Sequence, residues 1–390
     1  MSLSALISPF RQHKRPAFRK LELHVAHGCN LACESCSHYS NYGHAGTVSV
    51  EEADRWMGLW SRRVSVDRFT LLGGEPTIHP QFFEILDIAK RLPIKHLMVN
   101  TNGIRIAQDP GFAERLTTYM PDFEIYLQFD SFKPEVLTAL RGKDLSDIRY
   151  KALEKLNELN LSTTLVVTMQ KGMNDDEAGK IIEYALKQRC VRGVTFQPVQ
   201  IAGRFEHESE EKNRLTLTEV RDNILSQTSI FQPNDIIPVP CNPDALAMGY
   251  ALKLNGNVVP LTRYIDPAYL LDNSKNTIVY EQDTVLHDHL INIFSTGISV
   301  DKVTENMHQL LCCLPQIYAP GLSYENLFRV IIMRFIDAYD FDVRAIKKSC
   351  VHIVSKDGRI IPFETMNLFY RDDKEAYLND LKSRYDKIQF

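Results

Sequence analysis

The feature that most constrains the fold is an alternation of strand-like and helix-like segments between residues 20 and 200. The strand-like segments alternate apolar and polar residues or form short apolar runs, whereas the helix-like segments repeat apolar residues every three or four positions. The expected strands are 20–28, 67–74, 94–103, 122–130, 162–170 and 192–200. Strands and helices in such a series predict a parallel sheet with right-handed crossovers.

The number of these units limits the architecture. A closed TIM barrel needs eight strands, and only six are present. We therefore expect an α/β fold, a partial (βα)6 TIM-type barrel with an irregular α+β C-terminal extension. The expected domains are an N-terminal arm (1–19), the barrel (20–205), a linker with a helix (206–230) and a C-terminal region (231–390).

Several local elements can also be predicted. Ser49 and Glu52 have the spacing of a capping box at the start of a helix, and Asn174 is placed to cap a later one. In the C-terminal region, the steps 255–256 (Asn-Gly) and 357–358 (Asp-Gly) predict hairpins. Segments 323–339 and 375–388 are predicted helices.

Each of the six strand-like segments ends in a polar or glycine-rich sequence. These ends are HGCN, GGEP, TNG, QFD, TMQKG and QPVQ. In parallel sheets the carboxyl ends of neighbouring strands meet along one edge, where ligands bind. We therefore expect these sequences to line one site.

Three of the eight cysteines lie in the stretch GCNLACESC, directly after the first strand. Cys29, Cys33 and Cys36 have the spacing Cys-x3-Cys-x2-Cys, and thiolates suit iron–sulfur clusters, copper(I) and zinc. Three thiolates can hold three corners of a 4Fe–4S cluster and leave the fourth iron open. A zinc site completed by a distant residue and a redox pair formed by Cys33 and Cys36 are the alternatives.

The order of three motifs on consecutive strand ends resembles the radical S-adenosylmethionine (SAM) superfamily. The motifs are the cysteine triplet, GGEP at 73–76 and TNG at 101–103. The resemblance covers residues 20–200 and includes the partial barrel. It implies a 4Fe–4S cluster and bound SAM, which is cleaved reductively to a 5′-deoxyadenosyl radical that abstracts hydrogen from an organic substrate.

The resemblance also implies roles for residues at the strand ends. The carbonyls of Gly73 and Gly74, with Glu75 beside them, would accept hydrogen bonds from the SAM ammonium group, and Arg141 would pair with the SAM carboxylate. Ser35 stands where many members carry an aromatic residue that packs on the adenine of SAM. In this chain Tyr39 or a more distant aromatic residue would pack on the adenine instead. The other expected SAM contacts are Asn100, Thr101, Asn102, Gln128, Asp130 and Thr168.

Longer stretches are similar to one branch of the superfamily. LRGKDL, GVTFQPVQIAGR and IIPFETMNLFYR resemble the branch that contains archaeal tetraether lipid synthase and pterin methyltransferase-like proteins. This resemblance implies a transferase that forms C–C bonds or transfers an alkyl or methyl group. The chain lacks the long cysteine-rich N-terminal extension of the synthase.

The remaining cysteines extend the same interpretation. A C-terminal set of four thiols in a radical SAM protein implies an auxiliary iron–sulfur cluster, so a second cluster is expected; scattered core cysteines are the alternative. Cys190 is expected to be a core residue. The cysteines of the expected auxiliary set are Cys241, Cys312, Cys313 and Cys350.

Composition restricts the partners. A net charge of −4 provides no field that would recruit nucleic acid or an anionic membrane. No apolar run is long enough for a transmembrane segment, and the N-terminal sequence does not have the pattern of a signal peptide. We expect a cytoplasmic protein with a small-molecule or lipid-like substrate and an electron donor such as flavodoxin or ferredoxin.

Two other functions are compatible with the same motifs. One is radical SAM modification of a peptide, although no N-terminal peptide-binding module is evident. The other is a non-enzymatic iron–sulfur protein that retains the fold, but such a protein would be expected to have degraded GGEP and TNG motifs, and here both are intact.

Overall fold

The computed structural model describes most of the chain between residues 20 and 371. The described ranges are 20–37, 46–62, 66–206, 214–239, 242–254, 256–263, 324–355 and 357–371. The expected N-terminal arm and the predicted helix at 375–388 lie outside them. No helix in these ranges is both long enough and apolar enough to cross a membrane.

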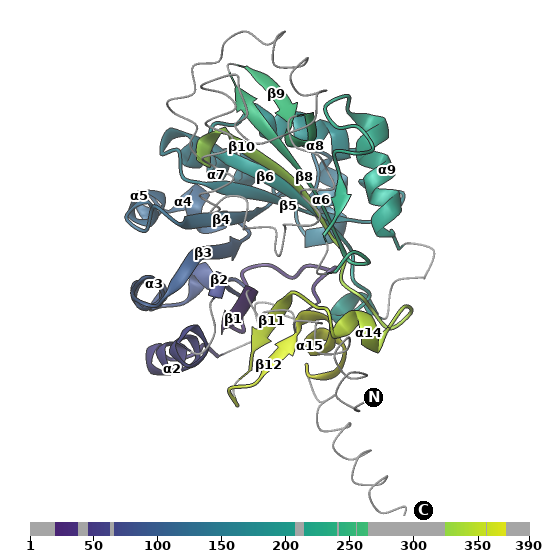
Figure 1. The fold of residues 1–390 in the computed structure, drawn as a ribbon. Helices are drawn as coiled ribbons and strands as arrows, with labels where there is room; N and C mark the ends of the chain where they lie inside the picture. The colour runs from purple at the N-terminus through teal and green to yellow at the C-terminus, as the bar shows by residue number, and fades with distance from the viewer. Residues whose placement is uncertain are drawn as a thin grey trace, which may run out of the picture.

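Six parallel strands form the centre of the fold in chain order, as the sequence predicts (Figure 1). Each pairs in parallel with its neighbours. The α/β fold class, with a mostly parallel sheet and a C-terminal extension, is therefore confirmed. The strands are β1 (Lys20–Ala26), β2 (Val66–Gly73), β3 (Ile94–Thr101), β4 (Phe123–Gln128), β5 (Thr163–Met169) and β6 (Val191–Pro198).

Helices between the strands cover the outer face of the sheet and bury a large apolar core against it. The predicted capping box is confirmed, because Ser49 accepts from the Glu52 backbone N–H and the Glu52 carboxylate accepts from the Ser49 backbone N–H. The helices are α2 (Val50–Ser61), α3 (Phe82–Arg91), α4 (Ile104–Gln108), α5 (Phe112–Thr117), α6 (Pro134–Arg141), α7 (Ser146–Glu158) and α8 (Ala178–Leu186), with the 3-10 turn η1 (Pro76–Ile78).

The prediction that Asn174 caps a helix is wrong. Helix α8 begins at Ala178. Asn174 is fully buried instead, and its side-chain amide donates to the carbonyls of Asp130 and Thr168 while its oxygen accepts from the Gln170 N–H. Asn174 thus joins the loops that follow β4 and β5.

Strands from the C-terminal region extend both edges of the six-stranded sheet. β10 (Leu327–Met333) pairs in parallel with β6, and β11 (Val351–Val354) pairs in parallel with β1. In Figure 1 the yellow strands β11 and β12 (Ile360–Pro362) lie beside purple β1, whereas β8 (Leu246–Leu254) and β10 lie beside β6. The remaining elements are η2 (Gly203–Glu206), α9 (Leu217–Gln227), β7 (Ile237–Pro238), β9 (Asn257–Pro260), η4 (Leu261–Arg263), η5 (Tyr324–Asn326), α14 (Val343–Ile346) and α15 (Phe363–Phe369).

Two C-terminal predictions are confirmed and one is wrong. The pairs β8–β9 and β11–β12 are the expected antiparallel hairpins. Segment 323–339 was expected to be a helix, but its apolar run forms β10. β10 lies between β6 and β8 and is buried on both faces, and a short apolar run of this kind suits a buried strand as well as a helix.

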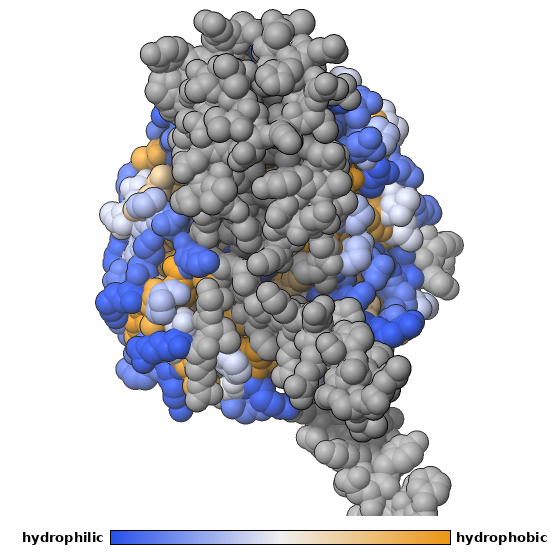
Figure 2. Space-filling view, in the orientation of Figure 1, coloured by the Kyte–Doolittle hydropathy of each residue, from blue (hydrophilic) through white to orange (hydrophobic). Residues whose placement is uncertain are grey.

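The inner face of the sheet carries polar side chains. Glu124 of β4 is fully buried and bonds with His96 of β3 at 3.0 Å and with Arg329 of β10. Arg329 also donates to Thr164 of β5 at 3.0 Å. β10 is thereby joined to the barrel interior by charge-assisted hydrogen bonds as well as by its backbone. On the outer surface, Figure 2 shows hydrophilic residues along the flanks of the visible face, with small hydrophobic groups between them.

Candidate active site

The three clustered cysteines lie on the loop that follows β1 and line one pocket. Cys29 and Cys33 are buried, and Cys36 is half-buried. Burial raises the pKa of Cys29 to about 12, with the nearby Glu75 adding to the rise. Burial also raises the pKa of Cys33, and the Arg141 guanidinium opposes this rise. The loop therefore brings three thiols to one concave surface.

A segment distant in sequence fixes the backbone of this loop. The backbone N–H of Arg204 donates to the Cys36 carbonyl at 3.1 Å, and Arg204 Nε donates to the Cys33 carbonyl at 2.7 Å. A Cβ on Gly203 would lie 2.4 Å from the Cys36 carbonyl oxygen, so this position requires glycine. The QIAGR sequence after β6 thus holds the cysteine loop in place.

Ser35 anchors the same loop to α6. Its backbone N–H and its hydroxyl both donate to the Leu140 carbonyl, at 3.4 and 3.2 Å. A phenylalanine at position 35 would lose the hydroxyl bond to the Leu140 carbonyl. Tyr39, the expected substitute for adenine packing, lies outside the described residues, so that expectation stays a prediction.

The glycines of GGEP pack against the backbone that precedes the cysteines. A Cβ on Gly73 would lie 2.2 Å from the Ala26 oxygen, and one on Gly74 would lie 2.1 Å from the Gly28 oxygen. The Gly74 and Glu75 N–H groups donate to these same two oxygens at 2.8 and 3.0 Å. The glycine pair therefore lets the β2 turn bond directly to the start of the cysteine loop.

Glu75 joins GGEP to TNG. Its carboxylate is buried and accepts four hydrogen bonds, from the Thr77 N–H and hydroxyl, the Thr101 hydroxyl and the Asn102 N–H, at 2.7–3.1 Å. Burial raises the pKa of Glu75 against the effect of these bonds. In this arrangement the carboxylate oxygens are already occupied by protein donors.

The three polar residues around TNG differ in what they offer a ligand. Thr101 donates to Glu75, and the Asn102 side chain bonds with Asn30 at 2.7 Å and with the Ile104 N–H at 3.1 Å. Asn100 lines the pocket, and its buried Oδ1 has no hydrogen-bond partner among the described residues. Asn100 is therefore the member of this group with unused hydrogen-bonding capacity.

Asp130, an expected SAM contact, lies behind the pocket wall. It adopts a left-handed φ of 57° and is fully buried. Its carboxylate accepts two bonds from Arg141, at 2.8 and 2.7 Å, one from Arg149 and one from the Thr168 N–H at 3.0 Å. Burial would raise the pKa of Asp130, but the two arginines hold it at about 2.

Arg141 connects the buried Asp130 to the pocket lining. Besides Asp130 it donates through Nη2 to the Thr168 hydroxyl at 2.9 Å, and both Arg141 and Thr168 line the pocket. The bonds to Asp130 and Thr168 use Nε and Nη2, and the guanidinium also forms a hydrogen bond with the Cys33 side chain. Gln128 also lines the pocket, and its carbonyl accepts from Arg149 at 3.1 Å.

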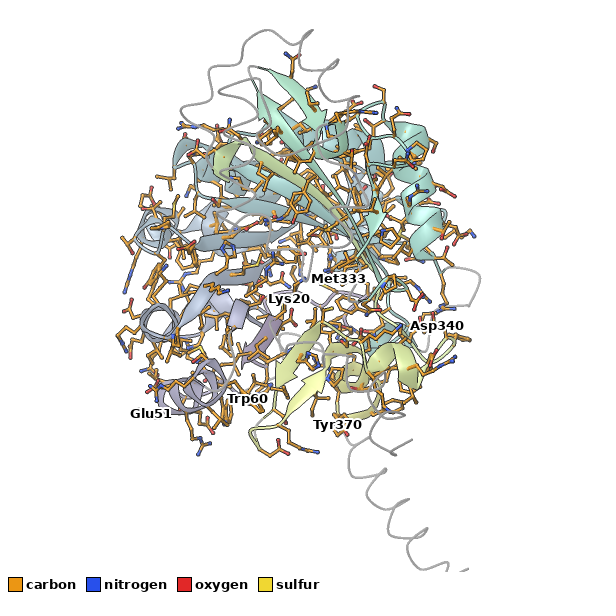
Figure 3. All side chains as sticks on the ribbon, in the orientation of Figure 1. Lys20, Glu51, Trp60, Met333, Asp340 and Tyr370 are labelled. Carbon is orange, nitrogen blue, oxygen red and sulfur yellow. The ribbon has the colours of Figure 1, made fainter. Side chains whose placement is uncertain are left out.

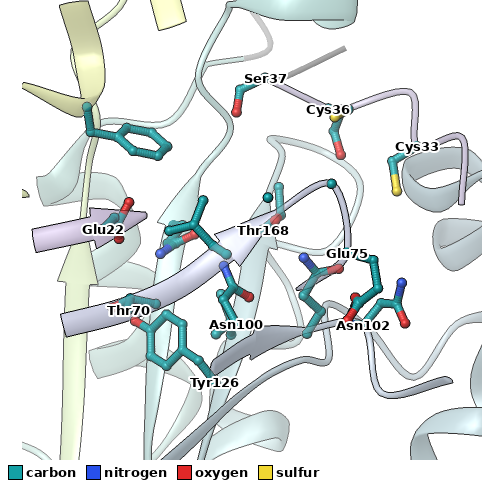
Figure 4. A pocket seen from close by; sticks show the side chains of 18 of the residues that line it. Glu22, Cys33, Cys36, Ser37, Thr70, Glu75, Asn100, Asn102, Tyr126 and Thr168 are labelled. Carbon is teal, nitrogen blue, oxygen red and sulfur yellow. Dashed lines mark hydrogen bonds between the residues drawn. The ribbon is translucent and has the colours of Figure 1, made fainter. Parts of the chain in front are cut away.

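The cavity itself has a volume of about 170 Å³ and extends from the cysteine loop into the barrel. Figure 4 shows Cys33 and Cys36 above Glu75 and Asn102 at one end, with Glu22, Thr70 and Tyr126 at the other. Asn100 and Thr168 lie between the two ends. In Figure 3, Lys20 and Met333, which also line this cavity, lie near the middle of the molecule.

Residues 23–185 match the family model of the Radical SAM superfamily. This part of the chain is a radical SAM domain. The chain is 26% identical over 392 aligned residues to a 7,8-dihydro-6-hydroxymethylpterin dimethyltransferase of Methanocaldococcus jannaschii, an alignment that covers 90% of this chain and 77% of the relative.

Other matches are more partial. A probable GTP 3′,8-cyclase of Pyrococcus abyssi is 27% identical over 44% of this chain and 54% of its own length. Among solved structures, Streptococcus suis SuiB bound to the precursor peptide SuiA gives a TM-score of 0.46 at 16% identity, covering 56% of this chain and 48% of SuiB. The chain thus spans about half of the length of both proteins.

The residues of the radical SAM domain fit the cofactors that the family implies. No set of three or more histidine, cysteine or acidic side chains within the described ranges is arranged to hold a single metal ion. An iron–sulfur cluster instead takes its thiolates at separate corners, and three thiols on one pocket-lining loop provide that donor set. Cys29, Cys33 and Cys36 would hold the cluster, and the unpartnered Asn100 oxygen is a polar group left for SAM.

The expected auxiliary cluster stays a prediction. Cys241, Cys312 and Cys313 lie outside the described residues. Cys350, directly before β11, is half-buried, and its Sγ contacts the Lys348 carbonyl at 3.6 Å. Cys190 is fully buried in the main apolar core, as expected.

The sequence interpretation missed the residues at the far end of the pocket. Lys20, Glu22, Arg68, Thr70 and Tyr126 all line it. A signal was present, because β1 and β2 alternate apolar and polar residues. In a parallel sheet whose outer face is covered by helices, the polar alternate positions point into the barrel.

Proposed function

We propose that this radical SAM enzyme transfers a methyl or other alkyl group to a small organic substrate, or forms a C–C bond on it. The proposal is carried by one observation: three thiols, Arg141 and Asn100 line a single cavity that continues into the barrel. The similarity to a dihydropterin dimethyltransferase over 90% of the chain supports methyl transfer. When bound, the reduced cluster and SAM would supply a 5′-deoxyadenosyl radical that takes a hydrogen atom from a substrate carbon.

The chain's own residues would bind and orient these groups. Arg141, held by Asp130 and Thr168 beside Cys33, would pair with the SAM carboxylate next to the cysteine loop. Asn100 would bond the SAM ribose or methionine end. The N–H groups of Gly74 and Glu75 donate to the carbonyls of Ala26 and Gly28, directly before the cysteines, so the cluster and SAM would be positioned by one connected unit.

The test begins with anaerobic reconstitution, an iron and sulfide count, and an assay for 5′-deoxyadenosine with dithionite and SAM. The Cys33→Ala variant is expected to form none, whereas the Cys190→Ala variant, altered in the core, is expected to retain activity. About four irons per chain would indicate one 4Fe–4S cluster, and about eight would indicate a second.

The SAM molecule that yields 5′-deoxyadenosine keeps its methyl group on methionine, so the transferred methyl group must come from a second SAM molecule. Methyl transfer is therefore tested by mass spectrometry of 7,8-dihydro-6-hydroxymethylpterin after incubation with the reduced enzyme and excess SAM. A gain of one or two methyl groups supports the finer proposal. If 5′-deoxyadenosine is absent under every condition, including with candidate substrates, the radical function is refuted.

A further inference from the structure

The barrel end of the pocket contains polar groups whose hydrogen bonds are not satisfied within the described structure. Glu22 Oε2 and Arg68 Nε are both buried and have no hydrogen-bond partner there. Both residues line the cavity, and Figure 4 shows Glu22 at the end away from Cys33 and Cys36. Buried polar groups normally form hydrogen bonds, so the unused hydrogen-bonding capacity of these two atoms points to a ligand.

Arg68 stands apart from the other buried arginines of the barrel. It is 6% exposed, and no hydrogen bond or ion pair joins its side chain to any described residue. By contrast, Arg141 and Arg149 share Asp130, and Arg329 bonds Glu124. Burying a charged group without hydrogen-bond partners is costly. Arg68 is therefore a hydrogen-bond donor at the cavity wall that a ligand can use.

Strand register explains why Glu22 and Arg68 do not satisfy each other. Arg68 of β2 is opposite Lys20 of β1, and Glu22 is opposite Thr70. Glu22 and Arg68 are therefore diagonal neighbours on the inner face. They are close enough for the Arg68 charge to act on the Glu22 carboxyl, but no ion pair forms. Acceptor and donor lie side by side, and a ligand can bridge them.

The surrounding wall restricts the shape of that ligand. Tyr126 and the contacting rings of Phe335 and Phe363, whose centroids are 4.1 Å apart, line the cavity together with Met98 and Val166. Rings and apolar side chains suit the faces of a flat molecule. A pure hydrocarbon would leave both polar groups unpaired, so the ligand must carry a donor and an acceptor of its own.

We propose that Glu22 and Arg68 form the substrate-recognition edge of the barrel, and that they bind a planar nitrogen heterocycle through an N–H donor and an adjacent carbonyl or ring-nitrogen acceptor. Glu22 accepts from the N–H, and Arg68 donates to the acceptor. This inference rests on the proposed function, which makes the pocket an active site, and it names the substrate class.

The test measures binding and keeps it separate from SAM cleavage. Cluster-loaded, oxidised protein with SAM present is titrated anaerobically with 7,8-dihydro-6-hydroxymethylpterin, which carries such an edge, and with 2-naphthylmethanol, a flat molecule that lacks it. The Glu22→Met and Arg68→Met variants keep side-chain length but remove the acceptor or the donors. Arg115→Met, on the exposed face of α5 and outside the cavity lining, is the matched control.

Each outcome decides the proposal. Support requires that wild type binds the pterin more tightly than the naphthyl alcohol, and that Glu22→Met and Arg68→Met each weaken pterin binding about 10- to 100-fold. The iron content and the far-UV circular dichroism spectrum of both variants should match the wild type, which shows that the variants fold and hold the cluster. Pterin binding that is absent in wild type, or unchanged in both variants, overturns the proposal. Loss of 5′-deoxyadenosine from wild type would instead count against the proposed function.

Discussion

Replacing Asp130 with asparagine tests the structural base of the proposed SAM site. Asp130→Asn keeps the shape of the side chain but removes the charge that two buried arginines share. Arg141 and Arg149 would then lie in the interior without a counter-ion. Arg149 is the more sensitive of the two, because burial already lowers its pKa to about 10 with Asp130 present.

The structure provides a scale for the loss. The pKa of Asp130 is held at about 2 against an ordinary value of 3.8, which corresponds to about 2.5 kcal/mol in favour of the ionised form in the folded state. Removing one partner of a buried ion pair typically costs about 3–5 kcal/mol. We expect Asp130→Asn to lower the free energy of unfolding by about 3 kcal/mol.

The sign of the pH dependence follows from the lowered pKa. The Asp130 contribution is fully present above pH 3.8 and is lost only as the pH falls through about 2. The difference between wild type and Asp130→Asn should therefore be constant between pH 5 and pH 8. A difference that changed across this range would indicate that another group is responsible.

The assay is urea unfolding under anaerobic conditions, followed by circular dichroism, together with SAM binding. The matched control is Asp176→Asn, since Asp176 pairs with Lys133 at 2.7 Å but its side chain is 65% exposed. Exposed pairs contribute about 0–1 kcal/mol. If Asp130→Asn lowered the free energy of unfolding no more than Asp176→Asn does, the buried ion pairs of Asp130 would not stabilise the fold.

Two further predictions follow from buried carboxyl groups. Glu75→Gln must turn an amide N–H₂ toward a donor such as the Asn102 N–H, so we expect this variant to weaken SAM binding and to lower the free energy of unfolding by about 1–3 kcal/mol. The control Glu84→Gln, on the exposed face of α3, should change neither SAM binding nor stability. Equal effects of the two variants would contradict the role given to Glu75. Glu22 has a pKa of about 8, raised chiefly by burial, so the folded chain keeps its proton between pH 4.5 and 8 while the unfolded chain releases it. As the pH rises through that window, the unfolding free energy of wild type should therefore fall relative to that of Glu22→Gln by up to about 1.4 kcal/mol per pH unit. Urea unfolding of both proteins at three pH values checks this, and a constant difference between them would refute it. The charged side chains that act on Glu22 are those of Lys20, Arg68, Glu364 and Arg371.

The barrel could be predicted from sequence because its signals are local. Alternation along β1 and the capping box at Ser49 depend on residues a few positions apart. The same reasoning failed for β10, because its apolar run does not show whether the neighbours will be strands or helices. That information lies in β6 and β8, far away in the chain.

The candidate site shows a similar limit. Motif order brought Cys29, Gly73 and Asn102 to one place, as their strand ends predict. The partners of each side chain depend on contacts between loops that no local pattern encodes. Asp130 and Glu75 carry charges that suggest ligand contacts, yet in the structure both carboxylates are occupied by protein donors.

The positions of β10 and β11 have a consequence for access to the pocket. These strands flank opposite ends of the six-stranded sheet, and residues 334–350 connect them along the chain. The two flanks are therefore tethered by one short segment, whose extended length sets the greatest distance to which they can separate. The same segment carries Phe335, which lines the cavity, so a deletion or insertion in 334–350 is expected to change the cavity wall opposite the cysteine loop without changing any residue of that loop.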